Sequence, residues 1–450
     1  MEERRLLLRD IEIPDIDTLP VYERRGGYAG AAAAFGPLKS DEIIAAVAAA
    51  GLRGRGGSWA PVADRWLAAA GHPDRQRFLA INAGETDPGL FRDRKLAERL
   101  PHRLLEGTII AARAMGAQVA YICQRPELRR GWQALERALA EAYEAGWLGR
   151  DVRGTGVRVD VYLHPCGGAC IGGEETALLA SLEGRRAEPR APDGRPPPHL
   201  LFGHPAVVHN AGTVAYLPLI LADGGAAFRA CGTELYRGTC VFCVSGHVRR
   251  PGLYEVELGA GTLRDLVEGL AGGVREGRHL KAVLPGGYAA PPLAPEQLDV
   301  ALTPEAWALP GGGRFPGVFL NGGIIAMDDT ACMVDAAVHL MRFYAAESCG
   351  QCPPCREGSL WLLRLLERLE AGAGQPGDVD LVADLARQVS PYLDLAGGTS
   401  LCGFGTAFAW VLQGFTRLFR EEFDHHLQAG GCPVPKDDAI KVPDSVNIRF

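Results

Sequence analysis

Residues 157–184 read VRVDVYLHPCGGACIGGEETALLASLEG, and this stretch decides the fold class. Its first third alternates apolar and polar residues, which is the pattern of a β-strand with one buried face. A glycine-rich turn follows, and a helix is predicted from Glu174 onward. A strand, a glycine turn and a helix in this order present backbone N–H groups to a phosphate in α/β proteins. We therefore expect an α/β layer here.

The first half of the chain continues this alternation of strands and helices. Short apolar runs at 77–83 and 118–124 predict two more strands. Helical patterns at 40–51, 101–117 and 130–149 accompany them. Strands that alternate with helices form a mostly parallel sheet covered by helices.

Two segments of this half show no such pattern. Residues 1–40 carry little periodicity, and we expect a leader that wraps the surface. Residues 185–205 are rich in proline and predict an extended loop.

The second half divides into a mixed region and a helical region. From about residue 236, a strand, a Pro-Gly turn, a second strand and a helix opening at Thr262 predict a small α+β module. From Asp328 onward, four helices are predicted at 328–346, 358–371, 378–394 and 403–428. The last residues, 431–450, lack helical periodicity and predict an extended tail.

Composition excludes several classes of protein. The 450 residues carry a net charge of −7 without a long basic block, which argues against a nucleic-acid partner. No apolar run is long enough to span a membrane, and the charged start does not resemble a signal peptide. The twelve cysteines therefore predict reduced thiols or metal ligands in the cytoplasm, not a disulfide framework.

The densest cysteine motif, ESCGQCPPCREGS at 347–359, contains Cys349, Cys352 and Cys355. The next cysteine, Cys402, lies far along the chain, just before the last long helical pattern. Three close thiolates and one remote thiolate suit a [4Fe–4S] cluster. Zinc, which usually takes two separated pairs, and simple packed or disulfide-bonded cysteines are the alternatives.

The surroundings of this motif add two expectations. Pro353 and Pro354 are expected to force non-helical backbone between two helices. Backbone N–H groups around Gly350, Gly403 and Gly405 are expected to donate hydrogen bonds to the sulfurs.

The remaining cysteines point to no site. Cys240 and Cys243 lie on a predicted strand and are expected to be core residues. A further set stands alone in the sequence and is expected to be chemically inert: Cys123, Cys231, Cys332 and Cys432.

A second glycine-rich stretch, GLRGRGGSWAPVADRW at 51–66, carries three arginines. Together with the turn before Glu175 it indicates a phosphorylated cofactor, although a structural turn is the default interpretation of each glycine run. Glu174 and Glu175 either cap a helix or bind ribose hydroxyls. The segment 82–94 follows a strand, where ligand-facing residues of such sheets lie.

Seven motifs in order give the chain a resemblance to a known family: GLRGRGG, NAGETDPGLFRDRKL, PHRLLEGTIIAARAMGA, IGGEETALLASLEGRRAEPR, FCVSGHVRRPGLYEV, ESCGQCPPCREG and SLCGFGTAFAWVLQGFTRLFREEF. They resemble the NADH-oxidising flavoprotein subunit of respiratory complex I and the diaphorase subunits of NAD-linked hydrogenases and formate dehydrogenases. The resemblance implies a Rossmann-like FMN and NADH domain at 41–235, a β-grasp (SLBB) module at 236–327 and a four-helix bundle with a [4Fe–4S] cluster at 328–430.

The resemblance also implies a mechanism and partners. NADH gives a hydride to FMN, and the cluster on the four cysteines is the first one-electron acceptor. The implied cofactors are FMN, NAD(H) and the [4Fe–4S] cluster. A thioredoxin-like iron–sulfur subunit and a larger iron–sulfur subunit are the implied partners.

By position, the resemblance carries a set of residues to the flavin and the nucleotide. Glu85 and Glu175 take the catalytic positions near NADH, and Arg65 stands where the family has a lysine. The full cofactor-binding set is Arg53, Gly54, Arg55, Gly56, Gly57, Arg65, Asn82, Glu85, Asp87, Gly173, Glu174, Glu175, Val208, His209, Asn210 and Thr213.

Several pocket positions depart from the family pattern: Ser58, Trp59, Ala60, Gly84, Cys170 and His209. Trp59 replaces a glycine, so its ring either stacks on the nucleotide or fills the space of a ligand. Two hypotheses follow. The first is an active NAD(H)- and flavin-dependent subunit, and the alternative is a non-catalytic relay or scaffold that keeps the cluster and has lost or altered the nucleotide site.

Overall fold

A five-stranded sheet with strand order β3-β2-β1-β5-β4 forms the centre of the first region. The computed structural model describes residues 1–166, 170–190, 199–307, 321–390, 399–432 and 434. Four strands are parallel, and only β4 at the edge is antiparallel. The strands are β1 (Phe78–Asn82), β2 (Val119–Gln124), β3 (Asp160–Pro165), β4 (His199–Leu201) and β5 (His204–Asn210). The predicted parallel layer is confirmed, whereas the extended loop predicted to reach residue 205 contains β4 and the start of β5.

Helices cover this sheet, and α6 is their centre because nearly all of its residues are buried. Its sequence explains its limits: Pro101 occupies the first turn, and Gly116 ends the helix in the left-handed conformation. The helices of this region are α3 (Ser40–Ala50), α4 (Val62–Ala70), α5 (Arg92–Arg99), α6 (Pro101–Met115), α7 (Arg129–Glu144), α8 (Glu175–Leu182), α9 (Ala211–Val214), α10 (Leu217–Ala222) and α11 (Ala226–Arg229). Short 3₁₀ turns occupy Val152–Gly154 and Cys170–Gly173.

The leader does not wrap the surface as predicted, because its apolar side chains belong to the core. It contains α1 (Leu19–Arg24) and α2 (Ala29–Phe35), and Leu7 and Ile16 are fully buried. Buried Glu106 on α6 anchors it by accepting hydrogen bonds from the Tyr22 hydroxyl at 2.5 Å and from two backbone N–H groups of the leader. Little in the sequence indicated that the leader is buried, because its apolar residues follow no regular helical or strand period.

The second region is a four-stranded sheet with order β7-β6-β9-β8. Its central strands β6 and β9 are parallel, and the two outer pairings are antiparallel. The strands are β6 (Thr239–Gly246), β7 (Gly252–Glu257), β8 (Leu280–Pro285) and β9 (Gly323–Asp328). The helix predicted at Thr262 is a six-residue π-helix, Asp265–Leu270, and 3₁₀ turns lie at Gly287–Ala289, Pro295–Gln297 and Pro304–Ala306.

The third region is a bundle of α13 (Met333–Glu347), α14 (Pro353–Glu370), α15 (Asp378–Val389) and α16 (Gly403–Leu418), followed by the shorter α17 (Arg420–Ala429). The single helix predicted over 403–428 is wrong, because the chain breaks at Phe419 between α16 and α17. The prolines also behave differently from the prediction. Pro353 and Pro354 begin α14, since proline is tolerated in the first turn of a helix, where its missing N–H would have no partner.

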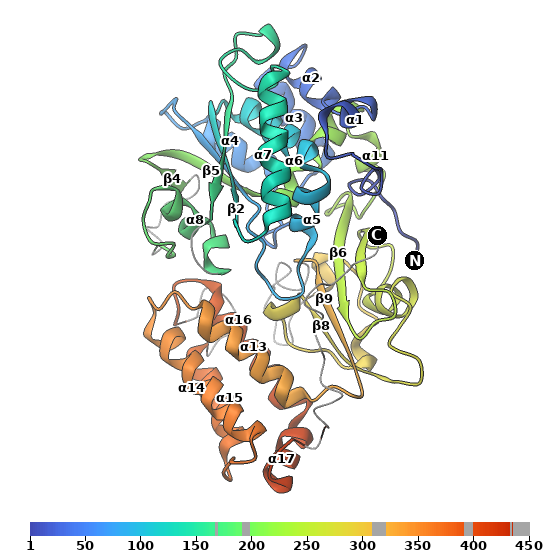
Figure 1. The fold of residues 1–450 in the computed structure, drawn as a ribbon, viewed down its shortest axis with the longest axis vertical. Coiled ribbons are helices and arrows are strands. Elements are labelled where there is room, and N and C mark those ends of the chain that lie inside the picture. Colours follow the sequence, from blue (N-terminus) through green and yellow to red (C-terminus); the bar gives the residue numbers. More distant parts are fainter. Residues whose placement is uncertain (167–169, 191–198, 308–320, 391–398, 433, 435–450) are drawn as a thin grey trace.

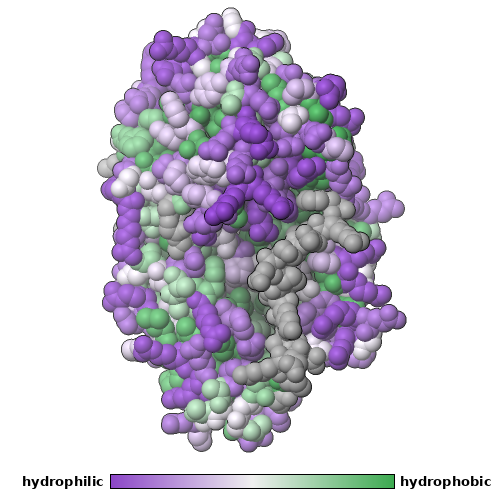
Figure 2. Space-filling model, viewed as in Figure 1, coloured by the Kyte–Doolittle hydropathy of each residue, from purple (hydrophilic) through white to green (hydrophobic). Residues whose placement is uncertain are grey.

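Figure 1 shows how the three regions meet. The bundle lies below the α/β region, and its upper end faces the segment that carries α8, while the second sheet lies beside both. On the face drawn in Figure 2, hydrophilic residues dominate the upper part and apolar residues are interspersed among them. Among the described helices, none combines the length and the apolar character needed to cross a membrane.

Replacing Glu106 with Leu should destabilise the protein, because the leader's three donors to this carboxylate would lose their acceptor in the core. We expect a loss of about 3 kcal/mol in the free energy of unfolding. Chemical denaturation of the variant measures it. The same change at exposed Glu144 on α7 is the control, and equal stability of the two variants would contradict the anchoring role.

Candidate functional site

A pocket opens where the strand order of the first sheet reverses. After β1 the chain adds β2 and then β3 along one edge of β1, whereas β5 pairs with the opposite edge of β1. Asn82 at the end of β1 and Asn210 at the end of β5 are register partners. The carboxyl ends of strands at such a reversal form the usual ligand crevice of doubly wound sheets.

Ten of the residues predicted to bind the flavin and nucleotide line this pocket, together with Ser58 and Ala60, two of the predicted pocket positions that depart from the family pattern. The ten are Gly54, Gly56, Arg65, Asn82, Gly173, Glu175, Val208, His209, Asn210 and Thr213. The two glycine-rich stretches, far apart in the sequence, thus meet at one crevice.

An ion pair occupies part of the pocket. One nitrogen of the Arg65 guanidinium donates to both carboxylate oxygens of Glu175, at 2.6 and 2.7 Å. Burial alone would raise the pKa of Glu175, but His199 and Arg65 outweigh it and hold this pKa below its ordinary value. Glu175 is therefore an anion at neutral pH, with a cation fixed beside it.

His209 is a neutral imidazole in this wall. Burial, reinforced by the Arg65 cation, lowers its pKa to about 3. The Trp66 indole N–H donates to Nε2 of His209 at 2.8 Å, so that nitrogen is the acceptor and Nδ1 carries the proton. His209 is one of the positions that depart from the family pattern. Because its imidazole is neutral, it adds no charge to the pocket.

Glycine is required at one point of the crevice wall. A Cβ atom on Gly56 would lie 2.8 Å from Cβ of Asn210, which is closer than such atoms approach in proteins. Gly54 is less restricted, because an added Cβ would lie 3.1 Å from the Ser58 hydroxyl oxygen and 3.8 Å from backbone atoms of Trp59 and Ala60. The backbone here is therefore bare toward the pocket, as a close approach to a ligand requires.

Six predicted residues do not line the pocket: Arg53, Arg55, Gly57, Glu85, Asp87 and Glu174. The Arg55 guanidinium is buried away from it and donates to the carbonyl oxygens of Arg53, Arg237 and Thr239. Arg55 therefore joins the first and second regions, and its side chain has no donor aimed at a phosphate. Arg53 likewise donates to carbonyl oxygens and packs over the Tyr236 ring.

The acidic residues of this set have structural contacts. The carboxylate of Glu85 accepts hydrogen bonds from the N–H groups of Asp93 and Arg94, at the start of α5. Burial and the nearby Asp93 carboxylate raise the pKa of Glu85 to about 7. Glu174 caps α8 by accepting from Ala177 N–H. Capping was one of the two interpretations of this residue.

Asp87 lies in a different contact, beside Cys170. The Cys170 thiol is 2.8 Å from a carboxylate oxygen of Asp87 and 3.6 Å from the Tyr288 hydroxyl. Burial raises the pKa of Asp87. This cluster joins the first region to the 3₁₀ turn after β8.

Trp59 follows neither of the two predicted alternatives. Its ring is buried in the core of the second region, edge-on to Tyr236 and under the Arg55 guanidinium. The residue has a left-handed backbone, with φ at 52°, which turns its side chain out of the crevice while Ser58 and Ala60 remain in the wall. Trp59 therefore neither stacks in the pocket nor fills it.

The four cysteines of the predicted cluster come together at the upper end of the bundle. Cys349 and Cys352 precede α14, Cys355 lies in its first turn, and Cys402 precedes α16. Cys355 is buried and the other three are half-buried against the same apolar cluster. Packing of α14 against α16 thus brings the remote thiol to the close three.

Backbone donors to these sulfurs follow the prediction around Gly403 and Gly405 but not at Gly350. Leu401 N–H donates to Sγ of Cys352 at 3.3 Å, and Phe404 N–H donates to Cys402, whereas Gly350 N–H donates to the Ser348 hydroxyl. Burial raises the pKa of Cys355 to about 11 and that of Cys402 to about 12. Thiolates in this environment need cationic partners, which iron provides.

The turn before α8 connects the pocket to the cysteines. Gly173 and Glu175 line the pocket, while the N–H of Cys170, a few residues earlier, donates to the Glu347 carboxylate two residues before Cys349. After α8, the Arg186 guanidinium donates to the Cys349 carbonyl at 2.6 Å. The pocket and the four thiols are therefore neighbours across one short segment.

A larger hollow, about 560 Å³, lies on the bundle between α15 and α16. Its walls include Asp380, Arg387 and Arg420, and it contains none of the four cysteines. It is open and lies outside the crevice at the sheet, so size alone does not identify the site.

Replacing Trp59 with Gly tests its placement. We expect a loss of about 2–4 kcal/mol in unfolding free energy, because removing a buried Trp costs about 3–5 kcal/mol and relief of the left-handed backbone returns about 1. Flavin content per chain should not change. Replacement of exposed Trp361 with Gly is the control. A rise in flavin content in the Trp59 variant would show that the ring blocks the pocket.

Family models match all three regions. A model described as the Nuo51 FMN-binding domain matches residues 47–219, an SLBB domain model matches 241–313, and a model of the NADH-ubiquinone oxidoreductase-F iron-sulfur binding region matches 335–426. An F-type subunit of the NADH-quinone oxidoreductase of Rhizobium meliloti is 39% identical over 95% of this chain and 99% of its own. The 51 kDa subunit of the mitochondrial NADH-ubiquinone oxidoreductase of Neurospora crassa is 40% identical over 86% of this chain and 77% of its own.

A solved structure gives the same picture. An NAD⁺-reducing [NiFe]-hydrogenase in the H₂-reduced state contains a chain that matches with a TM-score of 0.75 and 33% identity, over 95% of this chain and 67% of that one. The comparisons confirm the predicted fold class, the cofactors FMN and [4Fe–4S], and the function of an NADH- and FMN-dependent electron-transfer subunit in a multisubunit oxidoreductase. The chain belongs to the family of F-type subunits of NADH-quinone oxidoreductases.

Proposed function

We propose that the crevice between β1 and β5 holds FMN with NAD(H) beside it, and that Cys349, Cys352, Cys355 and Cys402 hold the [4Fe–4S] cluster that receives the electrons. The observation that carries this proposal is the short segment Cys170–Glu175. It lines the crevice at one end and contacts the cysteine loop at the other. Two redox groups exchange electrons rapidly only when they lie close together.

The crevice fits a flavin phosphate in its chemistry. Bare glycine backbone, the Arg65 cation and the Asn82 side chain all line this crevice at the carboxyl ends of the strands. Its volume is about 100 Å³, below the roughly 300–1,000 Å³ usual for cofactor pockets. Since Arg65 and Glu175 occupy part of it, binding requires this ion pair to move aside or to separate.

The chain's residues position the reactants, and bound FMN supplies the hydride and one-electron chemistry. Arg65 and Glu175, as an ion pair in the crevice wall, would set the charge around a bound flavin. Neutral His209, held by the Trp66 indole, presents a fixed imidazole. Glu85 serves as a positioning residue, because its carboxylate fixes the loop between β1 and α5 through backbone N–H groups.

The second hypothesis, a cluster-bearing relay without a working nucleotide site, draws on the small volume of the crevice. The placement of Trp59 weighs against it, because the most disruptive departure from the family pattern lies outside the crevice. The crevice also keeps its glycines, Asn82 and Glu175 in place. Retention of flavin by the purified chain decides between the two.

Electrons must leave the cluster for a partner. We propose docking of a thioredoxin-like iron–sulfur subunit and of a larger iron–sulfur subunit near the upper end of the bundle. Leu401 beside Cys402, and Leu360 and Trp361 on α14, are exposed apolar side chains close to the thiols in the sequence. The predicted tail, 431–450, falls almost wholly outside the described residues.

We also propose a cytoplasmic location, on the cytoplasmic side of a membrane where the complex is membrane-bound. All twelve cysteines are free in the structure, which is typical of proteins in reducing compartments.

Replacing Gly54 with Val should exclude the flavin while the fold is kept. The added Cβ would have one tight contact, 3.1 Å from the Ser58 hydroxyl oxygen, and the valine methyl groups would fill crevice space. We expect FMN content to fall about tenfold or more, since a clash of about 1.4 kcal/mol gives each tenfold loss. Flavin and iron are measured per chain in the same sample.

Gly269→Val is the matched control, because Gly269 is exposed and an added Cβ there meets nothing. Full flavin content in the Gly54 variant would rule out the crevice as the flavin site. Loss of iron together with flavin would indicate that the Gly54→Val variant misfolds. The smaller change Gly54→Ala would then be used as the test variant.

Replacing Cys402 with Ser should remove the cluster and leave the flavin, because one of four thiolates is lost. We expect iron and labile sulfide to fall severalfold, with FMN content unchanged. Cys166→Ser, outside the four, is the control. Iron and sulfide at wild-type levels in the Cys402 variant would contradict the ligand assignment.

A further inference from the structure

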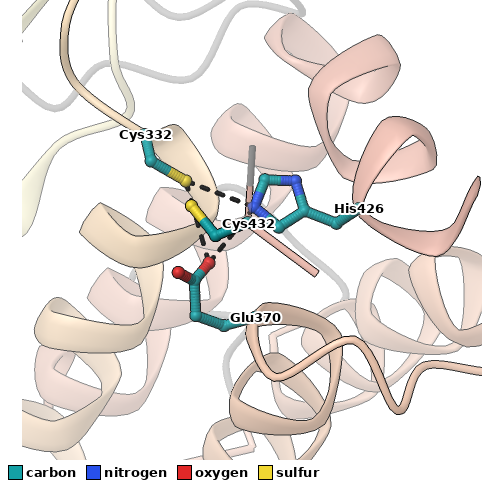
Figure 3. A group of neighbouring side chains, drawn as sticks. All are labelled: Cys332, Glu370, His426 and Cys432. Atoms are coloured by element: carbon teal, nitrogen blue, oxygen red, sulfur yellow. Dashed lines mark hydrogen bonds and ion pairs between the residues drawn. The ribbon is translucent and has the colours of Figure 1, made fainter. Parts of the chain in front are cut away.

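A second group of metal-binding side chains lies at the lower end of the bundle. Figure 3 shows Cys332, Glu370, His426 and Cys432 pointing toward one common centre. Their donor atoms all lie within 4.8 Å of one another. We propose that these four side chains bind one structural zinc ion.

The distances match the ligands of a single tetrahedral ion. Nε2 of His426 lies 3.3 Å from Sγ of Cys332 and 3.2 Å from a Glu370 oxygen, and that oxygen lies 3.7 Å from the same sulfur. With Zn–S near 2.3 Å and Zn–N or Zn–O near 2.0–2.1 Å, ligand atoms around tetrahedral zinc are separated by roughly 3.3–3.8 Å. Two sulfurs, one nitrogen and one oxygen are a donor set that zinc accepts.

His426 is oriented as a zinc ligand. It is fully buried, and its Nδ1 donates to the Glu422 carbonyl oxygen at 2.8 Å. This bond places the proton on Nδ1 and leaves the lone pair of Nε2 directed at the centre. A backbone carbonyl that holds the outer nitrogen is the usual support of a metal-bound histidine.

Cys332 is placed to act as a thiolate. It is the N-cap residue of α13, and its sulfur accepts a hydrogen bond from Asp335 N–H at 3.3 Å. A helix N-terminus favours negative charge at this position, as it does at reactive thiolates. Glu370 ends α14, and Cys432 follows α17 and contacts the Glu370 carboxylate.

The group is separate from the [4Fe–4S] site. Cys352 precedes the first residue of α14 and Glu370 is its last, so the 18-residue helix places them roughly 25 Å apart. Zinc here would tie the start of α13 to the ends of α14 and α17. The role is structural, because the four donors fill a tetrahedral shell and leave no position for a substrate.

The proposed site departs from the expectation that Cys332 and Cys432 are chemically inert. Each is solitary in the sequence, and only the return of α17 beside α14 brings them together. The same four side chains could instead form a Cys332–Cys432 disulfide, or a buried histidine–glutamate pair with two bystander thiols. The test separates both of these arrangements from a zinc site.

Metal analysis of the purified full chain provides the test, with a chelator wash and no metal-affinity tag. We expect about one zinc per chain in the wild type, and at least about tenfold less in Cys432→Ser, since a structural site needs all four ligands. Iron content should be the same in both. Cys432 is chosen because it lies after α17 and is half-buried.

Cys231→Ser is the matched control and should keep its zinc, because Cys231 lies outside both groups. Zinc K-edge absorption on the wild type adds a readout that does not depend on a variant. Two sulfurs and two nitrogen or oxygen neighbours support the proposal. Zinc absent from the wild type, retained in Cys432→Ser, or surrounded by four sulfurs overturns it, as does a Cys332–Cys432 disulfide in peptide mapping.

Discussion

The contact between the Cys170–Glu175 turn and the cysteine loop is the constraint on which the rest of the architecture depends. One end of this turn belongs to the crevice at the sheet, and the other is bound to Glu347 beside the cluster thiols. The bundle can serve the flavin only if it stays against this turn. The hydrogen bond from Arg186 to the Cys349 carbonyl strengthens the same junction.

The remaining contacts between regions keep that junction in place. Arg55, buried and bound to carbonyl oxygens on both sides, joins the glycine loop to the second sheet. The leader contacts both the first and the second region. Glu106 holds it to α6, and Glu255 of β7 accepts hydrogen bonds from the N–H groups of Leu7 and Leu8. The zinc site proposed at the far end of the bundle would fix the helices whose other ends carry the cluster.

The sequence predicted those features that depend on local spacing. The three-plus-one cysteines indicated the cluster, and the strand–glycine–helix stretch indicated the parallel sheet and its crevice. The direction of side chains was not predictable, because it depends on tertiary packing. Arg55 was expected at a phosphate and instead binds carbonyl groups, and Trp59 turns into a neighbouring core through a left-handed backbone. Cys332 and Cys432 come close together only because the chain breaks at Phe419, between α16 and α17. No proline or glycine stands at this break, so the sequence did not indicate it.

The most direct test of this account is an anaerobic titration of the purified, FMN- and iron-loaded chain with NADH, followed by visible absorption and electron paramagnetic resonance. The adjacency of crevice and thiols predicts that flavin absorbance bleaches and that the signal of a reduced [4Fe–4S] cluster appears in the same chain without any partner. Bleaching without a cluster signal would contradict the proposed contact between the two sites. A flavin that NADH does not bleach would contradict the proposed nucleotide site.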